Sequence, residues 1–146
     1  MAENRNALDT PVDQVKVQKD LPEGEEYEFV VASYQTGESP DKKTPYVDIK
    51  ARAVRAVTGD VEIDDTYWPV NHRFWTTEKA VGQLVGFLND TLGLPKTDNF
   101  GDALTSRELL EDAVGLAFNG VVGIEMRGKN KDRPARILVA IRPAQD

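Results

Sequence analysis

The sequence predicts a mainly β domain in which five strands are interrupted, after the third strand, by two helices. Three observations support this fold class. Residues 45–53 alternate apolar side chains at odd positions with polar or amphipathic ones at even positions, as in a strand with one face on a core. Residues 77–92 change to a helical period, and residues 116–141 return to strand-like composition.

The first two strands are expected to form a hairpin. In the first run, residues 27–34, the parity places three large apolar side chains on the core face: Tyr27, Phe29 and Val31. Glu28 and Tyr34 would then face solvent. Residues 35–44 are polar, contain Gly and Pro and hold no apolar side chain, which is typical of a long hairpin loop.

The third strand is predicted over residues 66–75. Pro69 cannot donate to a strand ladder, so this strand is expected at a sheet edge or with a bulge there. Asn71 and Arg73 are hard to bury, which favours the even positions as the core face. The residues on that face are Trp68, Val70, His72 and Phe74.

Two helices are predicted next. Residues 77–92 carry one apolar stripe at helical spacing, formed by Val81, Leu84, Val85, Leu88 and Leu92. Gly93 is expected to end this helix. The segment Thr-Ser-Arg-Glu at 105–108 is a capping box that starts a short second helix ending near Gly115.

A second hairpin closes the chain. Its first strand is predicted over residues 116–127, where Gly120 and Gly123 would allow a bulge or a close approach of another element. Residues 128–134 form a basic loop, and residues 135–141 form the last strand.

Composition limits the function classes. The net charge is −7, yet residues 127–146 hold six basic and two acidic side chains, a local net of +4. The absence of cysteine excludes disulfides, thiolate chemistry and Cys-based metal sites. No apolar run approaches the roughly 20 residues of a membrane span and no signal peptide is evident, so a cytoplasmic location is expected, without membrane contact.

The domain is expected over residues 21–146, preceded by a polar, mobile arm over residues 1–20 without periodicity. The element order, three strands, two helices and two strands, is the layout of the OB-fold. This five-stranded barrel binds oligonucleotides or sugars across one sheet face and its loops. An open α+β sheet with helices on one side has the same order, so both architectures remain open.

Four short segments carry a family resemblance. They are Leu-Pro-Glu-Gly-x-x-Tyr at 21–27, Lys-Lys-Thr-Pro-Tyr-Val at 42–47, Phe-Trp-Thr-Thr-Glu at 74–78 and Val-Gly at 114–115. Over roughly residues 20–142 the chain resembles small bacteriophage proteins encoded near replication and recombination genes. The resemblance implies an OB-fold and a role as a single-stranded-DNA-binding or recombination-mediator protein.

Binding of single strands requires a basic groove for phosphates and aromatic side chains on which bases stack. The outward faces of the first three strands supply seven candidates: Tyr34, Tyr46, Lys50, Arg52, Tyr67, Arg73 and Trp75. The alternative for Tyr67 and Trp75 is packing in the core or at its rim.

The hairpin loops supply the remaining candidates. Five basic residues surround the last hairpin: Arg127, Lys129, Lys131, Arg133 and Arg136. Lys42 and Lys43 lie in the first hairpin loop, on the other side of the channel that an OB-fold uses. The alternative is that both tips are merely solvated and resist aggregation.

No enzyme motif is present, and His72 is expected to be a packing residue rather than a ligand or base. We therefore expect no enzyme and no cofactor. The predicted function is binding of single-stranded DNA without sequence specificity, in phage replication or recombination. Phage or host replication and recombination proteins are expected as further partners, and homo-oligomerisation is left open. The rivals are a protein–protein interaction module and a virion-associated structural β-barrel.

Overall fold

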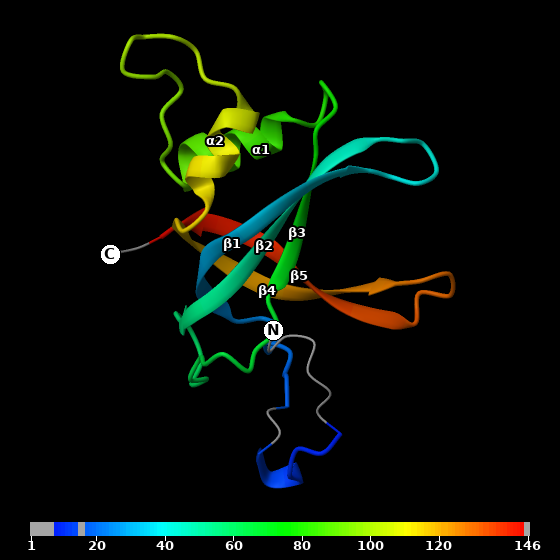
Figure 1. Cartoon of the computed structure of the whole chain (residues 1–146). Helices are drawn as coiled ribbons and strands as arrows, with labels where there is room; N and C mark the ends of the chain where they lie inside the picture. The colour runs from blue at the N-terminus through cyan, green and yellow to red at the C-terminus, as the bar shows by residue number, and fades with distance from the viewer. Residues whose placement is uncertain (1–7, 15–16, 145–146) are drawn as a thin grey trace.

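Five strands form one antiparallel sheet in the order β3-β2-β1-β4-β5 in the computed structural model, which describes residues 8–14 and 17–144 (Figure 1). The strands are β1 (Glu26–Glu38), β2 (Pro45–Ala56), β3 (Val70–Trp75), β4 (Ala117–Arg127) and β5 (Arg133–Pro143). The predicted mainly β class, with helices inserted after the third strand, is confirmed. In the described part of the chain no ladder joins the edge strands β3 and β5, so the sheet does not close into the predicted barrel.

The inner face of the sheet carries the core, as the alternation predicts. The buried residues that confirm the expected parity are Tyr27, Phe29, Val31, Val47, Ile49, Ala51, Ala53, Val70 and Phe74. The Phe29 ring stacks on Phe118 of β4 with centroids 5.6 Å apart. This contact ties the first hairpin to the last one across the centre of the sheet.

A β-bulge changes the parity of β1. Val31 lies opposite Ala51 and Ser33 lies opposite Lys50, so one extra residue is accommodated between them. Beyond the bulge, Tyr34 lies opposite the buried Ile49 and packs against the core. The expectation that Tyr34 faces solvent is therefore wrong, because a bulge reverses every side chain that follows it.

The first hairpin is longer than the composition suggests. Residues 35–38 belong to β1, where Gln35 and Thr36 lie opposite Asp48 and Val47 of β2. The loop is reduced to residues 39–44 and is closed by a hydrogen bond from the Ser39 amide to the Thr44 carbonyl, 2.9 Å long. Polar residues thus continue the ladder of β1 beyond the last apolar residue of its sequence pattern.

The third strand begins later than expected, directly after Pro69. Trp68, predicted on the core face, is 54% exposed, whereas Tyr67 packs against the core. The segment before Pro69 pairs instead with the chain that leads into β1. The Lys19 amide donates to the Thr66 carbonyl at 2.8 Å, and the Trp68 amide donates to the Lys19 carbonyl at 2.8 Å.

The expected mobile arm lies partly on residues 1–7 and 15–16, outside the described residues. Its described part includes a short helical turn, η2 (Val12–Gln14), and Lys19, which is tied to the body by backbone hydrogen bonds. Within the described residues no helix is long and apolar enough to cross a membrane.

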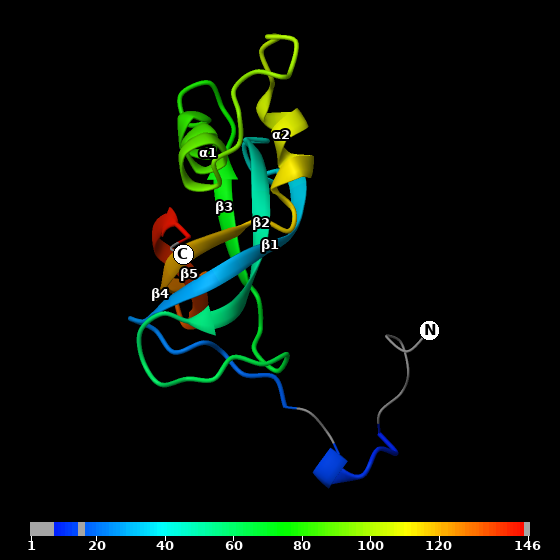
Figure 2. The same cartoon turned by 90° about the vertical axis from the view of Figure 1, so that its left-hand side faces the viewer.

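The helices cover one end of the inner face, as both views show (Figures 1 and 2). They are α1 (Gly82–Gly86), η3 (Phe87–Thr91) and α2 (Ser106–Ala113). The predicted helix over 77–92 starts later and widens in its last turn, where the Leu92 amide donates to the Phe87 carbonyl five residues back. Phe87, which lay off the predicted stripe, is buried together with Leu84 and Leu88, whereas Val85 is 39% exposed.

Two predicted helix ends are confirmed. The Thr105 hydroxyl accepts a hydrogen bond from the Glu108 amide at 3.2 Å, and the Glu108 carboxylate accepts one from the Thr105 amide, which completes the capping box. Gly93 has φ +75° where the first helical segment ends.

The second hairpin confirms the expected close approach at a glycine. A Cβ on Gly120 would lie 3.1 Å from Leu138 and 3.2 Å from Phe29, so a larger residue here would make these buried side chains shift. The ladder also shifts register between Val121 and Val122. The loop is shorter than predicted, residues 128–132, because β5 begins at Arg133.

Candidate nucleic-acid interface

Four side chains meet on the outer face of β2 and β3, and we call them the aromatic–arginine cluster: Tyr46, Asp48, Arg73 and Trp75. The register places Tyr46 opposite Trp75 and Asp48 opposite Arg73. The Arg73 Nε and Nη2 atoms donate to the two oxygens of Asp48 at 2.7 and 3.0 Å. This bidentate pair fixes the guanidinium plane.

Arg73 also covers the neighbouring rings. Its guanidinium carbon lies 3.7 Å from the centroid of Tyr46 and 5.5 Å from that of Trp75, within cation–π range. The hydrogen bonds that Arg73 donates to Asp48 raise the pKa of Arg73 above its ordinary value, so the group stays charged. Because Asp48 balances that charge, Arg73 acts as a fixed planar group beside the rings rather than as a free phosphate ligand.

Tyr46 is held from two sides. A Cβ on Gly37 of β1 would lie 2.7 Å from the tip of the Tyr46 ring, and Arg73 of β3 covers the ring from the other neighbouring strand. The rings of Tyr46 and Trp75 meet edge to face, with centroids 5.8 Å apart. Trp75, at 40% exposure, is therefore the ring of the cluster that is open to a stacking base.

Two free cations continue the same outer face. Lys50 and Arg52 are exposed on β2, on the side that carries Tyr46. Neither makes an ion pair with any residue that the structure describes. The predicted placement of Tyr46, Lys50 and Arg52 on one outward face is confirmed.

A groove of about 400 Å³ separates β3 from the second hairpin. Its lining residues are Asn71, His72, Arg73, Trp75, Glu125, Arg127 and Ile137. Arg127 pairs loosely with Glu125, with Nη2 and Oε2 3.7 Å apart and both side chains about half exposed. The cluster thus opens into a channel whose far wall belongs to the basic hairpin.

The two hairpin tips extend from the same side of the sheet (Figure 1). The tip of the second hairpin exposes Lys129 and Lys131, and Arg133 is exposed at the start of β5. The tip of the first exposes Lys42 and Lys43. Among the described residues none of these five cations has an ion-pair partner, so their charges are available to a polyanion.

Three predicted site residues lie elsewhere. Tyr34 and Tyr67 pack against the core, which makes them structural. The Arg136 Nε donates to the buried Leu21 carbonyl at 2.8 Å, so this side chain fastens the entry to β1 instead of facing a ligand. Parity misplaces Tyr34 because of the bulge, whereas Arg136 is bound by Leu21, 115 positions away in the sequence, which no local pattern indicates.

His72 lies on the inner side of β3, at the floor of the groove. Its ring meets Phe74 edge to face at 4.6 Å. Burial lowers the pKa of His72 below its ordinary value, and the negative charge of Asp48 opposes this effect only in part. A neutral, partly buried imidazole fits the packing role expected from the sequence.

The sequence reasoning missed the residues that shape the site without binding anything themselves. The alternation of residues 45–53 marks Asp48 only as an outward polar residue, although an acid directly opposite an outward Arg on the next strand predicts a cross-strand pair. Asn71, Glu125 and Ile137 line the groove because β3 and β5 face each other, which no local pattern encodes.

The sequence matches no protein-family model, and no curated protein matches it. The site must therefore be interpreted from its own chemistry. Within the described residues no three His, Asp or Glu side chains gather in an arrangement that could hold a metal ion.

Proposed function

We propose that this protein binds single-stranded DNA, without sequence preference, across the outer face of β2 and β3 and the groove beside it. The observation that carries the proposal is the exposed Trp75 ring, set beside a fixed Arg73 and flanked by two basic hairpin tips. Any base can stack on an aromatic ring, and an unpaired lysine can bind any phosphate. A role in phage replication or recombination accords with the family resemblance.

We further propose that the sheet is a partly open OB-fold. The strand order β3-β2-β1-β4-β5 and the helices between β3 and β4 support this assignment. The two edge strands flank one groove, which β3 lines with Asn71 and β5 with Ile137. OB-folds are often incompletely closed, and they bind oligonucleotides on the face of their second and third strands. In this chain that face carries the aromatic–arginine cluster.

Fluorescence anisotropy of a labelled oligothymidine tests the proposal. Binding should weaken between about 50 and 200 mM salt, with log K falling by roughly 0.7 per neutralised phosphate. Duplex DNA of the same length should bind more weakly, since paired bases cannot stack on Trp75. Absence of binding to any oligonucleotide at low salt would refute the proposal and favour a protein-binding module.

A further inference from the structure

Two lysines hold a backbone conformation that the described part of the chain otherwise adopts only at glycine. Among the described residues φ is positive at six glycines and at two other positions, Lys43 (φ +52°) and Lys131 (φ +51°). A Cβ makes this left-handed region unfavourable, and asparagine and aspartate are the side chains that tolerate it best. Lysine has no such tolerance, so both positions lower the stability of the fold.

Lys43 closes the tip of the first hairpin, residues 39–44. Its amide donates to the Ser39 carbonyl at 3.0 Å, and the Thr44 amide donates to the Ser39 hydroxyl at 3.0 Å. The Ser39 amide donates in turn to the Thr44 carbonyl at 2.9 Å. These three hydrogen bonds fix the backbone of Lys43 directly before β2 begins at Pro45.

Lys131 has the corresponding place in the tip of the second hairpin, residues 128–132. Its amide donates to the Gly128 carbonyl at 3.1 Å, which closes a tight turn before β5 begins at Arg133. The two tips differ in length and in the hydrogen bonds that close them, yet both place lysine at the left-handed position. The turns themselves would favour glycine or asparagine there, so the lysine side chain has another use.

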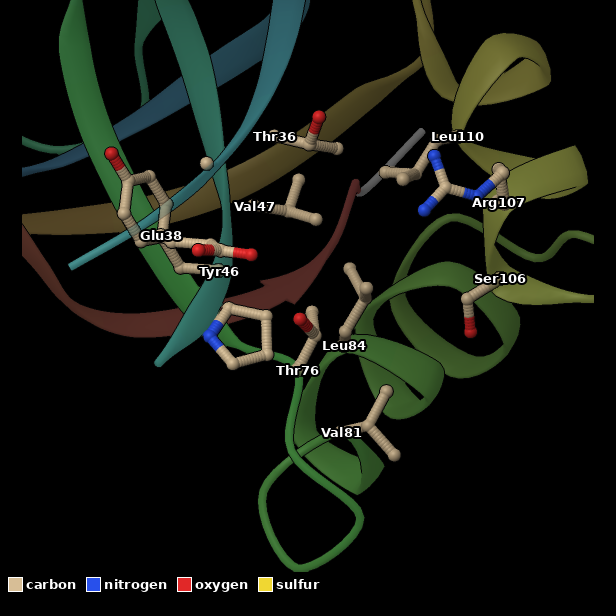
Figure 3. Close-up of a pocket in the computed structure, with 12 residues that line it drawn as sticks. Thr36, Glu38, Tyr46, Val47, Thr76, Val81, Leu84, Ser106, Arg107 and Leu110 are labelled. Carbon is tan, nitrogen blue, oxygen red and sulfur yellow. The ribbon is translucent and has the colours of Figure 1, made fainter. Parts of the chain in front are cut away.

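Both lysines are exposed, and neither makes an ion pair with a residue that the structure describes. Each tip also holds one acid, Asp41 in the first and Asp132 in the second, against two lysines, so each loop keeps a net charge of +1. Glu38, the last residue of β1, lines the cavity between the first hairpin and the helices (Figure 3). The acids therefore reduce the positive charge of the tips without cancelling it.

Strained backbone of this kind persists in proteins where a function requires a particular side chain. The two hairpins that carry the strained lysines also contribute Tyr46 and Arg127 to the candidate interface. Their tips extend from the same side of the sheet (Figure 1). A lysine ammonium binds a phosphate as a point charge and does not distinguish the bases, which agrees with binding that has no sequence preference.

We propose that Lys43 and Lys131 each bind one phosphate of the same single strand, one from either hairpin tip, at a cost in fold stability. The inference rests on the proposed function, because it assigns phosphates of the bound strand to these two residues. Lys42 and Lys129 are their neighbours at negative φ. In the described part of the chain no backbone hydrogen bond across the loop fixes either neighbour, so they add only general positive charge.

Lysine-to-asparagine variants test both parts of the proposal. Lys43→Asn and Lys131→Asn remove a charge and suit the left-handed backbone, so each should raise the melting temperature by about 2–4 °C and weaken binding to a labelled oligothymidine. Lys42→Asn and Lys129→Asn are the matched controls, since they remove the same charge from the same tips at negative φ. They should leave the melting temperature unchanged.

The salt dependence of binding counts the phosphate contacts. In anisotropy titrations between about 50 and 200 mM salt, Lys43→Asn/Lys131→Asn should reduce the slope of log K against log salt by roughly 1.4, or 0.7 for each phosphate. The control pair Lys42→Asn/Lys129→Asn should reduce it by less than one such increment. Lys43→Arg/Lys131→Arg keeps both the charges and the strain, so it should bind like the wild type without a gain in melting temperature.

Two results would overturn the inference while the proposed function stands. One is oligothymidine binding that the double variant Lys43→Asn/Lys131→Asn leaves unaltered, and the other is an equal loss of slope in the control pair. Melting temperatures that rise in neither asparagine variant would also overturn it, because lysine at these positions would then cost no stability. A wild type that binds no oligonucleotide would refute the proposed function and this inference together.

Discussion

The Arg73 guanidinium lies 3.7 Å from the centroid of the Tyr46 ring, and Asp48 holds it there through two hydrogen bonds. Two aromatic residues that are equivalent in the sequence thereby acquire different roles. Tyr46 is covered by Arg73 and braced against Gly37, whereas Trp75 keeps an exposed ring. Tyr46 therefore positions the cluster, and Trp75 offers the stacking surface.

Replacing Trp75 by Ala should weaken binding to oligothymidine by about 1–3 kcal/mol, the contribution of one stacked base, while the melting temperature changes little. Tyr46→Ala should lower the melting temperature, in contrast to Trp75→Ala, because Arg73 and Trp75 lose their packing partner. Anisotropy titrations and thermal melts of the two variants separate these effects. Unaltered affinity in Trp75→Ala would remove this ring from the interface.

Replacing Gly37 by Ala tests the brace behind Tyr46 without changing any charge. The new methyl group would lie 2.7 Å from the ring tip, so the ring must leave its place between Gly37 and Arg73. We expect a loss of about 1–3 kcal/mol in the free energy of unfolding and weaker DNA binding. Gly82→Ala is the control, since its Cβ would meet nothing within 4 Å. Equal melting temperatures for both variants would contradict the assigned role of Gly37.

The basic tip of the second hairpin should act as an electrostatic clamp. The double variant Lys129→Ser/Lys131→Ser should bind every oligonucleotide more weakly, and its salt slope should flatten by roughly 0.7 for each lost phosphate contact. Lys79→Ser/Lys96→Ser removes the same charge from exposed sites outside the proposed interface and should keep the slope. If both double variants show the same slope, the tip is only solvated.

The alternation of residues 45–53 predicted the core face of β2 because burial on one side imposes a period of two. The capping box at Thr105 and the stop at Gly93 were equally predictable, since both are local hydrogen-bonding or steric rules. The element order followed from these local patterns. These patterns are predictable from sequence because none of them depends on contacts between distant strands.

The failures have a common physical cause. The bulge after Val31 turns Tyr34 inward, against the parity of the residues before it. Tyr34 gains burial by tertiary packing, and the strand loses its local period of two at the bulge. The bond from Arg136 to Leu21 joins residues 115 positions apart, which no window of sequence contains.

The chain before β1 should stabilise the body only through its last residues. A truncation that begins at Val17 keeps both backbone hydrogen bonds of Lys19 and its ammonium 5.2 Å from the Tyr67 ring centroid. A truncation that begins at Leu21 loses all three contacts and should lower the free energy of unfolding by about 1–3 kcal/mol, at about 0.5–1.5 kcal/mol per hydrogen bond. Denaturant melts that agree for both truncations would show that Lys19 contributes nothing.

His72 should make the stability depend on pH in a defined window. Burial lowers the pKa of His72 in the folded state below its ordinary value of 6.5, so the unfolded chain takes up a proton first as the pH falls. Protonation therefore favours unfolding. The free energy of unfolding keeps its full His72 contribution above about pH 6.5 and loses it progressively below that value.

The variant His72→Gln isolates this effect, because the carboxylates that titrate at lower pH are common to both proteins. Urea melts between about pH 7.5 and 5.5 should show the wild type losing more stability than the variant over this range. Since Asp48 favours the protonated ring, Asp48→Asn should depress the folded-state pKa further and steepen the loss in the wild-type background. Parallel curves for wild type and His72→Gln would mean that the imidazole titrates alike in the folded and unfolded chains, and that the groove floor is wetter than its packing against Phe74 implies.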